Sequence, residues 1–195
     1  MYTLIYYILD AIAIVIVTTL FEFLKAFLSY KQGDEIPKNM GKLTLNPAKH
    51  FEPIGFLLFL FSGYGWANPV ETSSRNYKDK KTGTIITYLV PMVIFVVIAA
   101  VIKIIMNVVI ISDSGFTAYV SLFLAVLARN FAAVAVFNII PVYPMSGSKL
   151  LRCFLTPNQA IKYAQYEKPL QILVIFLLVL GWLTPVLNAV VNLIV

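Results

Sequence analysis

The chain has 195 residues, of which 60% are hydrophobic and 12% are charged, and its formal net charge is +6. Soluble domains average about half apolar and about a quarter charged residues, so this composition indicates an integral membrane protein. The basic residues lie between long apolar blocks rather than on one face, which argues against nucleic-acid binding. The single cysteine excludes an internal disulfide framework.

Four apolar blocks are predicted to cross the membrane as helices, because each exceeds the roughly 20 residues that span a bilayer. They cover residues 4–28, 84–111, 116–140 and 170–195. No basic segment precedes the first block, and it is too long for a signal peptide, so we expect it to be retained as a span. A tight turn is predicted at residues 112–115. The fold class is therefore an all-α, polytopic helix bundle of about four spans, forming a single membrane domain over residues 1–195.

A shorter apolar run covers residues 53–64. At about a dozen residues it is too short to span as a helix, so we predict a re-entrant or interfacial segment. The alternating leucines before this run predict a short β-hairpin within residues 43–55.

Basic residues predict the topology, because Lys and Arg accumulate in cytoplasmic loops. Twelve of the fifteen fall within two loops, residues 29–83 and 141–169: Lys31, Lys38, Lys42, Lys49, Arg75, Lys78, Lys80, Lys81, Lys149, Arg152, Lys162 and Lys168. We therefore expect both loops in the cytosol and both termini outside.

Several stretches occur together in an order that is specific. A Leu-Thr-Leu-Asn-Pro sequence stands at residues 43–47, a Gly-Trp-Ala-Asn-Pro sequence at 65–69, and an Asn-x-x-Pro-x-x-Pro sequence at 138–144. In these stretches, and over essentially its whole length, the chain resembles the compact bacterial-type site-2 proteases, which are intramembrane zinc metalloproteases. The resemblance implies a location in the bacterial cytoplasmic membrane.

In that family two histidines four residues apart on the first helix bind zinc together with a later aspartate, and a glutamate beside the first histidine is the general base. Residues four apart share a helix face, and three protein ligands leave zinc an open position for water. The resemblance places Phe21 and Lys25 at the histidine positions and Ser146 at the aspartate position. Only Glu22, at the position of the base, is kept. The chain is therefore a degenerate member by this comparison, with no zinc expected, although active relatives carry zinc.

Glu22 and Lys25 are three residues apart, so their side chains are neighbours on one helix face. They are predicted to form an intramembrane polar network with Arg129. The Arg129 side chain could reach either Glu22 or Asp10. In the alternative interpretation, Lys25 extends to the cytosolic interface.

Asn138, Pro141 and Pro144 interrupt the third block, because proline removes a backbone donor and blocks helix continuation. The resemblance implies that this segment docks an unwound substrate segment; the alternative is a plain helix terminator. His50 is interpreted as a structural loop residue, and Cys153 as a buried thiol.

These observations predict a pseudoprotease that binds or regulates transmembrane segments or membrane proteins within the lipid bilayer without cutting them. An active intramembrane metalloprotease with atypical ligands is the first alternative. A small transporter is the second, since intramembrane charges also line ion paths.

Overall fold

The computed structural model describes residues 2–108 and 115–195. This part of the chain is helical and contains no strand, which confirms the predicted all-α class. Its elements are α1 (Tyr2–Lys31), α2 (Ile36–Asn39), the 3-10 turn η1 (Pro47–Lys49), α3 (Pro53–Ser62), the 3-10 turn η2 (Ser74–Asn76), α4 (Lys80–Val108), α5 (Phe116–Phe137), α6 (Ser146–Phe154), α7 (Pro157–Val179) and α8 (Thr184–Ile194).

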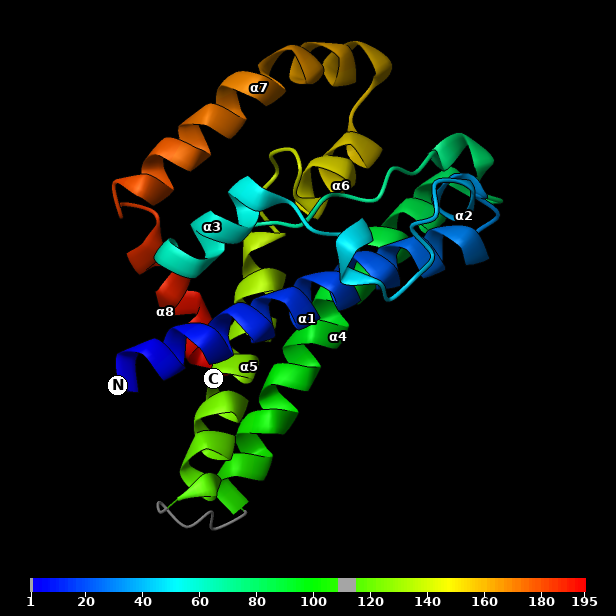
Figure 1. The fold of residues 1–195 in the computed structure, drawn as a ribbon. Helices are drawn as coiled ribbons and strands as arrows, with labels where there is room; N and C mark the ends of the chain where they lie inside the picture. The colour runs from blue at the N-terminus through cyan, green and yellow to red at the C-terminus, as the bar shows by residue number, and fades with distance from the viewer. Residues whose placement is uncertain (1, 109–114) are drawn as a thin grey trace.

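The core is formed by α1, α4 and α5. Helices α4 and α5 pack side by side, and α1 crosses both of them (Figure 1). Each helix contributes one buried aromatic ring to the crossing. The Phe95 ring of α4 meets Phe21 of α1 edge-on at 5.0 Å between centroids and Phe131 of α5 at 4.8 Å. Edge-to-face pairs stabilise a fold by about 0.5–1.5 kcal/mol each beyond the apolar area they bury.

Helices α1, α4 and α5 are long and apolar enough to cross a membrane, which makes the chain a polytopic helical membrane protein. Their observed ends differ a little from the predicted ones. Helix α4 begins at Lys80, where the Asp79 carboxylate accepts the N–H groups of Lys81 and Thr82. These hydrogen bonds also lower the pKa of Asp79. The predicted turn at 112–115 lies mostly outside the described residues.

The predicted fourth span, residues 170–195, is not one straight helix. Helices α7 and α8 are bent by 79° at a short break, which is the geometry of a broken span or of a re-entrant loop. Gly181 lies in this break with φ of 72°, a left-handed conformation that glycine adopts without strain. Pro185 then stands in the first turn of α8, where its missing N–H costs no hydrogen bond.

Helix α3, at 10 residues, is about 15 Å long, which is too short to cross a bilayer. It begins where the Glu52 side chain accepts the Gly55 N–H and ends at Gly63 in a left-handed conformation. An extended segment, residues 64–73, then leads back towards α1. The hairpin predicted within residues 43–55 does not form. Instead Asn46 caps η1, because Pro47 favours the first position of a helical turn.

Candidate functional site

Glu22 and Lys25 form an ion pair inside the bundle. Both belong to α1, and Lys25 Nζ lies 2.5 Å from Glu22 Oε1. Glu22 is 4% exposed and Lys25 is 2% exposed, so the protein encloses both side chains. Lys25 thus turns towards Glu22, as in the predicted pair, and not towards solvent. A buried charge is costly unless it is paired, and this pair satisfies both members.

Two aromatic rings flank the Lys25 ammonium. Its Nζ lies 5.1 Å from the ring centroid of Phe21 and 6.0 Å from that of Tyr88. The negative face of an aromatic ring attracts a cation, so these rings add to the stabilisation from Glu22. Phe21 also packs against Phe95, which fixes the ring between the ion pair and the core.

The second oxygen of Glu22 contacts backbone from elsewhere in the chain. Val70 N–H donates to Glu22 Oε2 at 2.8 Å, and both residues are buried. Val70 belongs to the extended segment 64–73, which is thereby tied to α1. Both carboxylate oxygens of Glu22 are thus engaged by groups of the protein itself.

Close backbone contact places this extended segment against α3. A Cβ atom added to Gly65 would lie 2.0 Å from the carbonyl oxygen of Gly55, so only glycine fits there. Further along, Asn68 N–H donates to the His50 carbonyl oxygen at 2.8 Å, and Lys42 Nζ donates to the Asn68 carbonyl oxygen at 3.3 Å. Burial lowers the pKa of Lys42. The loop before α3 therefore holds the segment that covers Glu22.

Asn138 and Pro144 line the same small cavity as Glu22, which measures about 10 Å³. This is about the space that one water needs. Asn138 Nδ2 donates to the Val134 carbonyl oxygen, and Asn138 Oδ1 accepts from both the N–H and the hydroxyl of Ser146 at 3.1 Å. Asn138 therefore closes the turn from α5 to α6 and brings Ser146 next to the site. Pro141 is exposed; docking of a partner segment here stays a prediction.

Arg129 does not join Glu22 and Lys25. Its Nη2 lies 3.3 Å from Asn188 Oδ1, and its guanidinium sits 5.9 Å from the ring centroid of Tyr64. The Tyr64 hydroxyl donates to the same Asn188 oxygen at 2.8 Å. This second cluster ties α5 to α8 and to the start of the extended segment.

Asp10 is the other carboxylate that Arg129 was expected to reach. It is bonded instead by Asn130, the residue that follows Arg129. Asn130 Nδ2 donates to Asp10 Oδ1 at 2.8 Å, and both side chains are buried. The predicted three-residue network is thus divided into separate polar clusters along the bundle.

The side chains around Glu22 do not fit a zinc ion. Zinc in a catalytic site takes three nitrogen, sulfur or carboxylate ligands. Within residues 2–108 and 115–195, no three His, Cys, Asp or Glu side chains gather at one point. A phenyl ring, an ammonium and a hydroxyl stand where the resemblance places the ligands.

The histidine and the cysteine lie apart from this site. His50 is buried, and its Nε2 bonds the Thr44 carbonyl oxygen at 2.9 Å, which agrees with a structural role. Cys153 was expected to be buried, but it is partly exposed on the wall of a different pocket, because α6 is amphipathic and lies outside the core.

Comparison with known proteins gives one informative relative. The chain is 29% identical over 186 residues to a Bacillus subtilis (strain 168) protein named "Putative zinc metalloprotease YwhC". The alignment covers 91% of this chain and 85% of that protein. No protein-family profile matches the chain, and no solved structure matches it. The similarity extends over nearly the whole chain, so it relates the entire bundle to a metalloprotease-like protein.

Proposed function

We propose that this protein is a non-catalytic relative of the intramembrane zinc metalloproteases that binds transmembrane segments of partner membrane proteins without cutting them. The observation that carries this proposal is the engagement of Glu22. The only retained catalytic-type carboxylate accepts from Lys25 Nζ and from Val70 N–H. Both of its oxygens are bonded within the protein, which supports a structural role rather than that of a general base.

Electrostatics supports the loss of the metal. Lys25 occupies a position where the resemblance places a ligand, so its ammonium would stand beside a bound dication. Two unit charges of like sign that lie about 4 Å apart repel each other by about 4 kcal/mol at an effective dielectric constant near 20. A zinc ion next to Lys25 would therefore be opposed by charge as well as by missing ligands.

A groove on the bundle supports the binding role. It has a volume of about 890 Å³ and lies between α3 and the bent pair α7 and α8. Apolar side chains line most of it, including the exposed Leu57, Phe61 and Val179. The polar side chains of Ser62 and Asn188 also face it. Lipid tails offer no hydrogen bonds to such groups, whereas a polar side chain of a transmembrane helix does. A helical transmembrane segment is therefore the occupant that matches this lining.

In the proposed topology the loops 29–83 and 141–169 lie in the cytosol and both termini lie outside. The accumulation of Lys and Arg in these loops supports this orientation. The segment that covers Glu22 then enters the bundle from the cytosolic side.

Metal content and proteolysis test the loss of catalysis. Purified protein, dialysed against zinc and then against buffer, is expected to hold far less than one zinc per chain, and a transmembrane reporter co-expressed with it should stay intact. A full equivalent of zinc, together with reporter cleavage that disappears in Glu22→Gln, would restore the alternative of an active protease with atypical ligands. Ion flux in liposomes that disappears in Arg129→Gln would favour the transporter.

Site-specific photo-crosslinking tests the binding role. A photoreactive residue at Phe61 or Leu57 is expected to capture membrane proteins through single transmembrane segments, mapped by mass spectrometry of the crosslinked peptides. The matched control is the same residue at Val97, which is exposed on α4 away from the groove. Capture of lipid alone from the groove positions, or equal protein capture at Val97, would contradict the proposal.

A further inference from the structure

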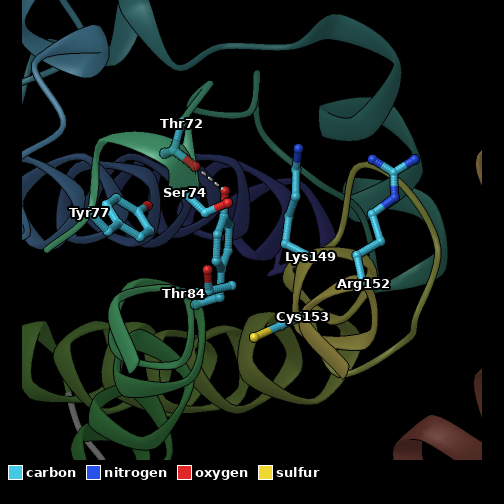
Figure 2. Close-up of a pocket in the computed structure, with 8 residues that line it drawn as sticks. Thr72, Ser74, Tyr77, Thr84, Lys149, Arg152 and Cys153 are labelled. Atoms are coloured by element: carbon cyan, nitrogen blue, oxygen red, sulfur yellow. Dashed lines mark hydrogen bonds between the residues drawn. The ribbon is translucent and has the colours of Figure 1, made fainter. Parts of the chain in front are cut away.

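A second cavity lies apart from Glu22, between the beginning of α4, helix α6 and the segment around η2. Its volume is about 190 Å³, many times the roughly 10–15 Å³ that one water needs. Figure 2 shows its eight lining residues, which are Thr72, Ser74, Tyr77, Thr84, Tyr88, Lys149, Arg152 and Cys153. Two are cationic and five carry a hydroxyl group, whereas none carries a carboxylate.

The two cations come from one face of α6. Lys149 and Arg152 are three residues apart, and in Figure 2 both extend from this helix in the same direction. Arg152 Nη2 pairs with Glu167 Oε2 at 2.9 Å, but Arg152 Nε is buried and has no hydrogen-bond partner among the described residues. A buried donor without a partner is costly, so a ligand oxygen at this atom would remove the penalty.

The positive charge of Lys149 is also only partly balanced by neighbouring groups. Burial lowers the pKa of its ammonium, and the neighbouring Arg152 guanidinium lowers it further. Glu167 and, more weakly, Glu71 act in the opposite direction, but the Glu167 carboxylate is already paired with Arg152. An anion placed between the two cations would offset both the desolvation of Lys149 and the repulsion between them.

The hydroxyl groups supply further donors. The Tyr88 and Thr72 hydroxyls lie 2.6 Å apart and share one hydrogen bond, so one of their two protons is left to donate into the cavity. Ser74 makes no hydrogen bond with its hydroxyl within the part of the chain that the structure describes. Figure 2 shows Thr72 and Ser74 across the cavity from Lys149. Donors on opposite walls suit a ligand with several acceptor oxygens.

We propose that this cavity binds a phosphate group, carried either by the headgroup of an anionic phospholipid or by a free phosphate. A tetrahedral oxyanion matches the donors of Lys149, Arg152 and Ser74, and charge-assisted hydrogen bonds are the strongest of their kind. The cavity lies one to two turns from the beginning of the spanning helix α4, at Thr84 and Tyr88, and the ends of spanning helices are where lipid headgroups are met. The proposal is independent of the role of Glu22.

Cys153 is the only cysteine of the chain, so its alkylation rate by N-ethylmaleimide reports on this cavity alone. The rate is measured in detergent micelles with and without inorganic phosphate, and in nanodiscs of phosphatidylcholine with and without phosphatidylglycerol. Slowing by inorganic phosphate indicates the free anion, and slowing by phosphatidylglycerol only indicates the headgroup. Either result supports the site, whereas no slowing in either arm would overturn it.

The variants are compared by the ratio of rates with and without the anion, because removing a cation also changes the reactivity of the thiol itself. In Lys149→Gln/Arg152→Gln, the concentration at which the anion reaches half of its slowing effect should rise about tenfold or more. Lys162→Gln removes an exposed charge of α7 outside the cavity and should leave it unchanged. Because Arg152 also pairs with Glu167, Ser74→Asp serves as a second variant that repels the anion from an exposed position. If the anion slows the alkylation of Cys153 equally in the double variant, in Ser74→Asp and in wild type, the proposal is overturned.

Discussion

Lys25 Nζ lies 2.5 Å from Glu22 Oε1, one helical turn away on α1 and within the bundle. Removing one member of a buried pair leaves an uncompensated charge and costs about 3–5 kcal/mol, whereas replacing both by apolar residues is often nearly neutral. Lys25→Met should therefore lower the free energy of unfolding by about 3 kcal/mol. The double variant Glu22→Leu/Lys25→Met should lose much less.

Thermal unfolding of the purified variants in detergent measures this difference. Lys31→Met is the matched control, because Lys31 stands exposed at the end of the same helix and should change stability little. If the single and the double variants at the pair lose equal stability, the ion pair contributes nothing and the interpretation is wrong.

The predictable part of the fold depends on local properties of the chain. Three spans follow from hydropathy, because each stretch of about 20 apolar residues buries its own backbone hydrogen bonds. The break between α7 and α8 is different. Residues 170–195 are mostly apolar, and Gly181 and Pro185 within such a run are compatible with either a kinked or a broken helix. Only packing selects the left-handed conformation of Gly181.

The candidate site also has a part that local sequence predicts and a part that it does not. The pairing of Glu22 with Lys25 follows from a spacing of three on a helix. The contact from Val70 N–H cannot be predicted, because a backbone amide 48 positions away carries no signal in its side chain.

The burial of Asp34, in the loop after α1, could not be predicted either. Asp34 is fully buried, and its carboxylate accepts from the Ser29 hydroxyl, from the Ser73 N–H and from the Asn76 side chain. A polar residue in a loop gives no sign of such burial before the loop is folded.

Restoring the missing ligands should restore zinc binding. The variant Phe21→His/Lys25→His/Ser146→Asp places two imidazoles on one face of α1 and removes the ammonium that would repel the metal. After dialysis its zinc content should rise towards one per chain, as measured by elemental analysis. Phe21→His alone supplies one imidazole and keeps Lys25, so it should stay near the wild-type level. Absence of zinc from a folded triple variant would show that the ligand positions have been assigned wrongly.

Gly65 should tolerate no side chain, because an added Cβ would lie 2.0 Å from the Gly55 carbonyl oxygen, which cannot move without shifting α3. Gly65→Ala is expected to lower the free energy of unfolding by about 1–3 kcal/mol, as overpacking does. It should also expose the covered face of α1, which hydrogen exchange of the α1 amides would detect. Gly41→Ala is the control: nothing lies near its added Cβ, so only the left-handed backbone at φ of 66° costs about 1–2 kcal/mol. Unchanged exchange of α1 in Gly65→Ala would contradict the role of this contact.

His50 should make stability depend on pH. Its Nε2 donates to the Thr44 carbonyl oxygen, so Nδ1 is the unprotonated nitrogen, and Nδ1 is buried with no partner among the described residues. Burial lowers the pKa of His50 below 6.5. As the pH falls through about 6.5, the unfolded chain therefore binds a proton before the folded protein does. The free energy of unfolding is then greatest above this pH and decreases below it, until the pH reaches the lowered pKa of the folded state. Thermal unfolding in detergent at pH 7.5 and 5.5 should show a larger drop for wild type than for His50→Gln, which cannot titrate. An equal drop in both proteins would mean that another group is responsible.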